Sequence, residues 1–252
     1  MNNKNLHQSK INKNDEYYTY YDDVVTGLEP YKSYLIGKRV LCPCDTDDSN
    51  FVKYLRELGC DVICYHKENG DEWYKPEDYD VCVTNPPFSK IKSFYQTFND
   101  KPLIFVCTLN HLTNVGIFED FIEGRLNVGK SFPRLYCNAK GEHKGISLGM
   151  FVSNLNIVES NPPIPLCKDN KGVYLDGTNI LNVDKSCYIP SNYYDILAVP
   201  ISYIGKHNDK QFKIIGIANT NSKSNKYDIL TPYVNGKQKF KRLLIRRRKT
   251  VY

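Results

Sequence analysis

The sequence has no long apolar run and no apolar stretch at its start. A helix needs about 18 consecutive apolar residues to cross a bilayer, and no segment approaches that length. The first sixteen residues, MNNKNLHQSKINKNDE, lack the apolar core of a secretory signal. Residues 1–14, rich in Asn and Lys, have little to bury. We therefore expect a disordered segment over 1–14, no membrane partner and a cytoplasmic location.

The sequence also has no pattern of metal ligands. Its five histidines are scattered, and its nine cysteines contain no pair of CxxC elements. We therefore expect no metal site. Cys64, Cys82 and Cys107 lie within the apolar runs VICY, VCV and IFVCT. Free cysteine behaves as a small hydrophobe in a reducing compartment, so these residues are predicted to lie in the core.

The composition that remains is that of an ordinary globular protein, 41% hydrophobic and 25% charged. The formal charge is +6, and the stretch KQKFKRLLIRRRK (237–249) contains no acidic residue. Such a strip can contact a nucleic-acid backbone, although a solvated basic tail is the alternative. Leu243, Leu244 and Ile245 inside the strip favour an ordered element.

Apolar periodicity predicts strands alternating with helices in the first half of the chain. Strands are expected at 38–42, 61–65, 78–84 and 102–108. A helix interrupted near Pro30 precedes them, and two capped helices start at Ser49 and Ser89. This alternation indicates an α/β fold with a mainly parallel sheet, whose strands end at one edge. Ligands bind at that edge in such folds.

The pattern changes after about residue 145. Strands are expected at 146–155, 195–204 and 212–219, separated by Pro-rich or polar loops without a clear helix. We therefore expect a catalytic domain at 15–155 and a smaller, mostly β or irregular portion at 156–252.

Asn85-Pro86-Pro87-Phe88 directly follows the predicted strand 78–84. The amino group of a base is a poor nucleophile because its lone pair is delocalised into the ring. The side-chain carbonyl of Asn85 and the next prolyl carbonyl can accept both amino hydrogens, and the two prolines fix these acceptors in place. Phe88 can stack on a base rotated out of its helix. The alternative is a Pro-Pro turn that merely closes a strand.

Several blocks of sequence together resemble the EcoRI-like adenine-specific DNA methyltransferases. The blocks are DEYYT (15–19), VLCPCDTDDSNF (40–51), NGDEW (69–73), DYDVCVTNPPF (78–88), YDILAVPISYI (194–204), QFKIIG (211–216) and FKRLLIRR (240–247). The resemblance implies a Rossmann-like sheet that binds S-adenosyl-L-methionine (SAM) and a C-terminal target-recognition portion. It also implies a role in restriction-modification, in a bacterial or phage-infected cell.

The resemblance implies roles for particular residues. The cofactor-binding set would be Tyr18, Thr19, Cys42, Asp45, Ser49, Asn50, Asp71 and Trp73. Asp45 would meet the methionine ammonium, and Asp71 would accept from the adenine amino group of SAM. Glu68 is a weak candidate for the ribose hydroxyls. Phe151 would form the second wall of the target-base pocket, and the DNA contacts would come from Lys239, Lys241, Arg242, Arg246 and Arg247.

The sequence departs from the general methyltransferase pattern in its first loop, CPCDTDDSN, which contains no glycine. Pro43-Cys44 in this loop resembles the nucleophile of cytosine-C5 methyltransferases. It precedes the cofactor helix, however, and direct transfer to nitrogen needs no covalent intermediate, so we interpret Cys44 as structural. Each Asp of the loop has a further interpretation as a helix cap or turn former.

The prediction from sequence is therefore a SAM-dependent methyltransferase that acts on adenine N6 in double-stranded DNA by base flipping. Three alternatives stay open: an RNA adenine substrate, a protein glutamine substrate, or a DNA-binding relative that has lost SAM. We expect a monomer. The sequence leaves open the recognition site and whether a separately encoded restriction endonuclease is a partner.

Overall fold

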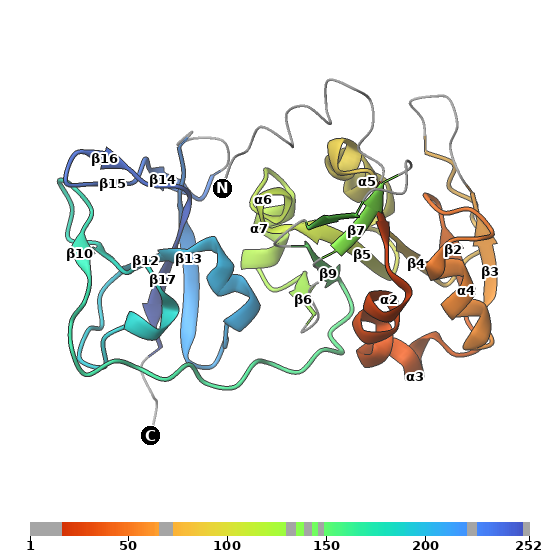
Figure 1. Cartoon of the computed structure of the whole chain (residues 1–252), viewed down its shortest axis with the longest axis horizontal. Helices are drawn as coiled ribbons and strands as arrows, with labels where there is room; N and C mark the ends of the chain where they lie inside the picture. Colours follow the sequence, from red (N-terminus) through yellow and green to blue (C-terminus); the bar gives the residue numbers. More distant parts are fainter. Residues whose placement is uncertain are drawn as a thin grey trace. The chain divides into compact units, whose positions relative to one another are not determined.

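The computed structural model describes residues 17–65, 73–129, 135–138, 143–145, 149–220 and 226–248 (Figure 1). These residues divide into two compact units. The first holds the described residues of 17–113 and 124–158, and the second holds 114–123 and those of 159–248. None of the helices within these ranges is long and apolar enough to span a membrane.

The first unit is built on a six-stranded sheet of order β3-β2-β4-β5-β9-β6. Its strands are β2 (Arg39–Cys42), β3 (Asp61–Cys64), β4 (Val81–Thr84), β5 (Leu103–Thr108), β6 (Asn127–Val128) and β9 (Gly149–Ser153). The first four pair in parallel, whereas β9 is antiparallel to β5 and to β6. The predicted α/β class, the four parallel strands and the strand around Phe151 are thereby confirmed.

Helices cover both faces of this sheet. Phe105 of β5 packs against Phe94 and Tyr95 of one helix. Phe151 of β9 packs against Phe51 of another. Phe105 is paired with Val152, the neighbour of Phe151, and successive side chains of a strand point to opposite faces. The two helices therefore lie on opposite sides of the sheet.

The helices of the first unit follow the predicted apolar patterns. They are α2 (Tyr21–Leu28), η1 (Glu29–Tyr31), α3 (Lys32–Leu35), α4 (Asn50–Glu57), η2 (Phe88–Lys90), α5 (Ile91–Phe98) and α6 (Leu109–Leu112). The interruption near Pro30 is confirmed. Ser49 caps α4, since its side chain accepts a hydrogen bond from Val52 N at 3.2 Å. Gly59, at φ 79°, follows the end of that helix.

The predicted start of the second capped helix is wrong. Ser89 lies inside the 3-10 turn η2, and α5 begins at Ile91 with no side-chain cap. The reason is local: Lys90 N donates to Pro87 O at 2.9 Å, which closes a tighter turn before the helix starts. The apolar stripe of α5, Ile91, Phe94, Tyr95 and Phe98, is buried as predicted.

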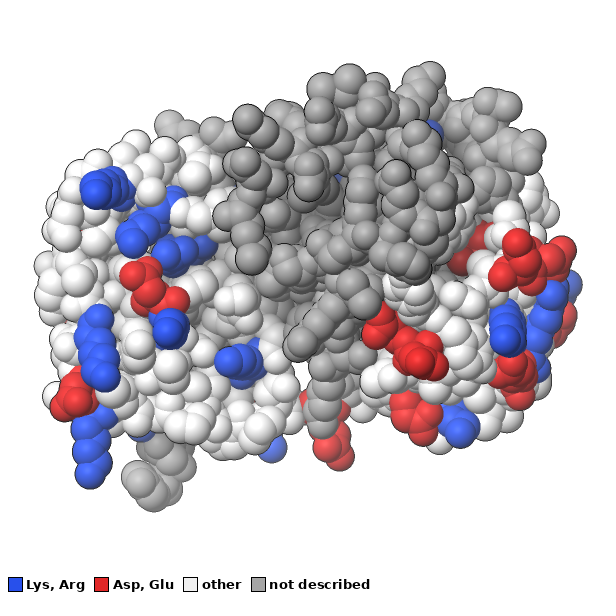
Figure 2. Space-filling view, viewed as in Figure 1, with Lys and Arg blue, Asp and Glu red and all other residues white. Residues whose placement is uncertain are grey.

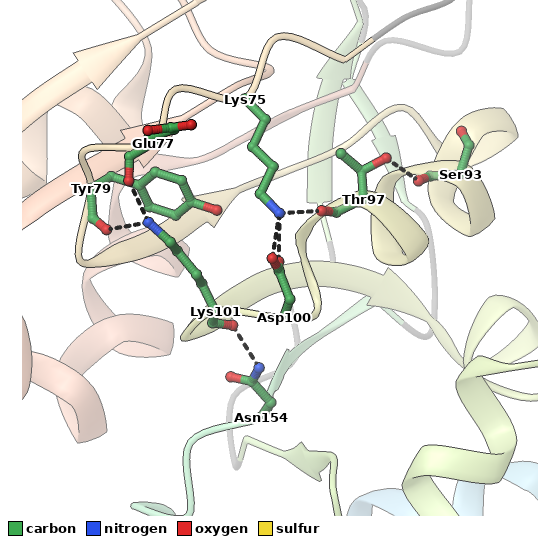
Figure 3. A network of polar contacts seen from close by, with 8 residues as sticks. All are labelled: Lys75, Glu77, Tyr79, Ser93, Thr97, Asp100, Lys101 and Asn154. Atoms are coloured by element: carbon green, nitrogen blue, oxygen red, sulfur yellow. Dashed lines mark hydrogen bonds and ion pairs between the residues drawn. The ribbon is translucent and has the colours of Figure 1, made fainter.

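Two lysines hold the amino-terminal edge of this sheet together (Figure 3). Lys75 Nζ donates to Thr97 O at 2.8 Å and to the Asp100 carboxylate at 2.6 and 2.7 Å. Lys101 Nζ donates to Glu77 O at 2.5 Å and lies 4.2 Å from the Tyr79 ring centroid. These contacts fix the segment leading into β4. They therefore help to set where the carboxyl end of β4 lies.

A second, antiparallel sheet of the first unit has the order β1-β7-β8. It consists of β1 (Tyr17–Thr19), β7 (Leu135–Asn138) and β8 (His143–Gly145). β1 carries the end of the DEYYT block.

The second unit contains a mixed sheet of order β10-β11-β12-β17-β13-β14 and a separate hairpin, β15-β16. The strands are β10 (Val173–Tyr174), β11 (Leu181–Asn182), β12 (Leu197–Pro200), β13 (Phe212–Ala218), β14 (Asp228–Leu230), β15 (Tyr233–Val234), β16 (Lys237–Gln238) and β17 (Arg242–Arg247). Short 3-10 turns η3 (Ser186–Tyr188) and η4 (Ile201–Lys206) occur between strands. The predicted β-rich character of this region is borne out.

One helix of the second unit comes from an earlier part of the chain. α7 (Ile117–Ile122) lies in sequence between β5 and β6 but groups with residues 159–248. Its Phe118 ring meets Tyr227 edge-on at 6.1 Å, and Glu123 Oε1 accepts from Tyr227 Oη at 3.0 Å and from Lys226 Nζ at 3.1 Å. The sequence pattern did not indicate this helix.

Candidate active site at the carboxyl edge of the sheet

Two loops meet where the neighbouring strands β2 and β4 end. Thr84, the last residue of β4, donates from Oγ1 to Asp45 Oδ2 at 2.5 Å. Both residues are buried, with Thr84 0% and Asp45 7% exposed. Because Asn85 follows Thr84 directly, this bond joins the acidic loop to the start of the Asn-Pro-Pro-Phe segment. The structure thus brings together two motifs separated by 39 residues.

The Asn-Pro-Pro-Phe segment leads directly from β4 into η2. Asn85 is half-buried and Pro86 is buried. The Phe88 ring is 4% exposed and lies 5.6 Å from the His111 ring, between centroids. His111 belongs to α6, at the carboxyl end of β5, and its Nδ1 is 2.8 Å from Thr108 Oγ1. Three adjacent strands therefore contribute side chains to this edge.

The end of the DEYYT block lies against the start of α4. Asn50 Nδ2 donates to Thr19 O at 2.8 Å. Thr19 is 3% exposed, and its Oγ1 is buried without a hydrogen bond to any described residue. Tyr18 is 45% exposed. The structure therefore brings Thr19, Ser49 and Asn50 together.

The cysteines of the acidic loop region belong to the core. Cys42 is fully buried, and its main-chain oxygen accepts from Asp45 N at 3.4 Å and Tyr65 N at 3.0 Å. Burial raises the pKa of the Cys42 thiol well above its ordinary value, as it does for Cys82. Neutral, buried thiols are poor nucleophiles. No disulfide joins the described cysteines, and Cys44 is half-buried.

Trp73 packs on α5. Its ring meets Phe94 and Phe98 edge-on, at centroid distances of 5.6 and 6.1 Å, and its Nε1 donates to Ser93 Oγ at 3.3 Å. Two further residues predicted to bind SAM, Asp71 at the adenine amino group and Glu68 at the ribose hydroxyls, lie outside the described residues.

Phe151 has a different environment from the one expected. It is 0% exposed and packs between Phe51 of α4 and Gly27 of α2. A Cβ on Gly27 would lie 1.9 Å from the Phe151 ring. A side chain enclosed in this way helps to form the core of the sheet, so we do not carry forward its assignment to the base pocket.

Arg242–Arg247 of the basic strip form β17, a central strand of the six-stranded sheet of the second unit, and the basic residues of the strip differ in exposure. Arg242 is 8% exposed and donates to Asn182 Oδ1 at 2.9 Å and Asp184 Oδ1 at 3.1 Å. These contacts join β17 to the segment of β11 and the residues that follow it. Lys239 Nζ lies 3.7 Å from Asp184 Oδ2.

The other three basic residues predicted to contact DNA are at least partly exposed. Burial lowers the pKa of Lys241, which is half-buried. Arg247 donates to Ser191 O at 2.7 Å and lies over the Tyr194 ring at 5.1 Å. Arg246 is exposed.

The sequence reasoning missed Thr84 and His111. Thr84 immediately precedes the recognised motif, so its position was available as a signal, but its role depends on a bond to a distant loop. His111 carried no signal, because its contact with Phe88 exists only in the folded chain.

Comparison with known proteins confirms the resemblance stated from the sequence. The family model described as "Adenine-specific methyltransferase EcoRI" matches residues 5–59 and 75–249. The Type II methyltransferase M.EcoRI of Escherichia coli is 26% identical over 289 residues, covering 84% of this chain and 89% of that protein. The Type II methyltransferase M.MgeORF184P of Mycoplasma genitalium is 23% identical, covering 96% and 98%. No solved structure matches. The chain belongs to the EcoRI family of adenine-specific DNA methyltransferases.

Proposed function

We propose that this methyltransferase transfers the methyl group of SAM to adenine N6 in duplex DNA, at the edge formed by the ends of β2 and β4. The observation that carries the proposal is the buried hydrogen bond from Thr84 to Asp45. It joins a loop suited to the cofactor and a loop suited to the base on neighbouring strands. In parallel α/β sheets, ligands bind at this edge, which supports a Rossmann-like assignment.

The described residues fit SAM at this edge. Thr19 Oγ1 is a buried polar atom that makes no hydrogen bond to any described residue, and a buried polar group of this kind is stabilised by a ligand. Asp45 offers a carboxylate to the methionine ammonium. When bound, SAM supplies a methyl group on a positively charged sulfur. Asn50 acts here by holding the Thr19 main chain at the start of α4.

Asn85 and Pro86 hold the target amino group. The Asn85 side-chain carbonyl and the Pro86 carbonyl accept the two amino hydrogens, so that the nitrogen lone pair points away from the ring and toward the methyl group. The prolines fix both acceptors before the base arrives, which lowers the cost of reorganisation. The nitrogen–methyl bond would form as the sulfur–methyl bond breaks, with S-adenosylhomocysteine as the leaving group, and the methylated nitrogen would then lose one proton to solvent.

The position of the Phe88 ring affects how a flipped adenine can enter the active site. Its ring is buried against His111. Stacking of a flipped adenine on Phe88 therefore requires the ring to move off His111. Base flipping itself follows from the geometry of duplex DNA, in which the amino group of a stacked base cannot reach a buried active site.

The test is incubation with tritiated SAM and unmethylated DNA, followed by nucleoside analysis of the digest. Labelled N6-methyladenine is the expected product. Label on structured RNA or on protein instead would select one of the other substrates. Failure of SAM to raise the apparent melting temperature would favour an inactive DNA-binding relative.

Asn85→Ala is expected to lower kcat by at least about 100-fold, because it removes a preorganised acceptor. The melting temperature should change little, since Asn85 is only half-buried. Gln96→Ala, on the exposed side of α5, is the matched control and should keep the wild-type rate. An Asn85→Ala enzyme with a near wild-type rate would contradict the proposal.

A further inference from the structure

The hairpin β15-β16 has a turn with a strongly defined conformation. Tyr233 pairs with Gln238 and Val234 with Lys237, which leaves Asn235 and Gly236 as the two turn residues. Their φ angles are 51° and 71°, and Asn235 is the one non-glycine residue with positive φ among those described. Positive φ at both positions defines a type I′ turn, for which Asn-Gly is the preferred sequence.

The hairpin is anchored to the rest of its unit at several points. Asp176 accepts from Asn235 N at 2.8 Å and from Gly236 N at 2.7 Å. Asp176 N donates to Tyr233 O at 2.9 Å. Val234 is 8% exposed and packs in a cluster with Leu175, Ala198, Ala218 and Leu244. An isolated two-stranded hairpin is only marginally stable, so these contacts are what hold it in one position.

The anchored hairpin presents polar side chains that the fold does not use. Asn235, Lys237 and Gln238 are exposed. Within the described part of the chain, their side chains make no hydrogen bond or ion pair. Amide side chains can bind an adenine edge in a bidentate manner, and Lys can bind the O6 and N7 of guanine. The chemistry of the tip therefore matches that of base edges.

The unit that carries the hairpin is basic. Residues 159–252 contain 16 Lys and Arg against 7 Asp and Glu, and residues 114–123 add three acids and no Lys or Arg, so the unit has a formal charge of +6, whereas the rest of the chain has a formal charge of 0. Lys and Arg side chains spread over the described face of this unit in Figure 2. Such charge attracts a polyanion regardless of its sequence. Once a nucleic acid is bound to this basic unit, the exposed polar side chains of the anchored hairpin are suited to contact its base edges.

We propose that the β15-β16 hairpin enters the major groove of the target DNA and that Asn235, Lys237 and Gln238 contribute to sequence recognition. The inference rests on the proposed function, because it requires duplex DNA as the substrate. The major groove is about 12 Å wide and admits a two-stranded β-ribbon. Asp176 is a positioning residue, since it holds the turn through two main-chain amides and does not itself reach the bases.

The test compares the sites methylated in vitro by wild-type enzyme, N235G/Q238A and K237A, with N6-methyladenine mapped across unmethylated genomic DNA. Asn235→Gly preserves the positive φ of the turn, so the hairpin keeps its shape. The matched control is Lys210→Ala, which removes an exposed charge two residues before β13 begins, outside the hairpin. Melting temperatures and SAM binding are measured for every variant.

We expect N235G/Q238A to lower the rate ratio between the target and single-mismatch sites by about 5- to 150-fold, the range for losing one bidentate base contact. K237A should lower this ratio too, whereas K210A should leave it unchanged. An unchanged ratio in folded, SAM-binding hairpin variants would overturn the inference while leaving the proposed function intact. A wild-type enzyme that methylates no DNA would overturn both.

Discussion

The role of Asp45 at this site becomes evident from its contact with Thr84. In sequence it is one of several acids in a turn, and a role as a helix cap or turn former was the alternative. In the fold it is buried and accepts a hydrogen bond from Thr84, while Ser49 caps the helix. A buried carboxylate requires partners because desolvation is costly. This requirement singles out Asp45 among the acids of its loop.

His207 is a residue through which pH affects the stability of the second unit. Its Nδ1 lies 3.2 Å from Tyr203 Oη. Burial lowers the pKa of His207 from 6.5 to about 4; nearby Asp209 opposes this change and Arg248 adds to it. The unfolded chain therefore binds a proton that the folded chain excludes between pH 6.5 and 4. The stabilisation is complete above pH 6.5 and is lost as the pH falls to about 4.

The expected loss is about 3 kcal/mol at most, from 1.36 kcal/mol per pKa unit. Urea unfolding of the wild type and of His207→Gln, measured between pH 7 and pH 4, checks it. The variant cannot titrate here, so its free energy of unfolding should fall less over this range. Parallel pH dependences of the two proteins would rule out His207 as the cause.

At the scale of elements, α2 and β9 are fitted together at one glycine. Gly27 has no room for a Cβ because the Phe151 ring fills that space. Gly27→Ala is therefore expected to destabilise the protein by about 1–3 kcal/mol, the usual cost of overpacking, although alanine is the better helix former. Chemical denaturation measures the difference. Thr26→Ala, on the exposed side of the same helix, is the control and should be close to neutral.

The elements that could be predicted are those specified by local pattern. The strands that became β2 to β5 are continuous apolar runs, and α4 and α5 bear apolar stripes at helical spacing. α7 was missed because it has only six residues, and its partner Tyr227 lies over a hundred residues away. The buried environment of Phe151 could not be predicted, because the sequence around an aromatic residue in a strand is the same whether that residue lines a pocket or packs in a core. The buried contacts of Arg242 could not be predicted because its partners Asn182 and Asp184 lie about 60 residues away in sequence.

At the scale of the whole molecule, charge is divided unevenly along the chain. The region 159–252 holds more than the entire net positive charge, and the remainder is slightly acidic. We therefore expect the affinity for non-target duplex DNA to fall steeply as salt increases.

Arg246→Ala should reduce the slope of log K against log salt by about 1. Lys32→Ala, on α3 of the first unit, should leave it unchanged. Fluorescence anisotropy across a salt series distinguishes these outcomes, and equal slopes would exclude Arg246 from phosphate contact.

The position of α7 in the chain limits how the two units can be recombined. The polypeptide passes between them at three points: after Thr113, after Glu123 and after Val158. A cut at residue 158 would leave α7 behind, separated from β13 and from Tyr227, against which Phe118 packs. An exchange of the second unit between relatives must therefore transplant two separate stretches of gene. In a chimera with a single crossover at residue 158, α7 would come from one relative and the rest of its unit from another, so their packed side chains would not match.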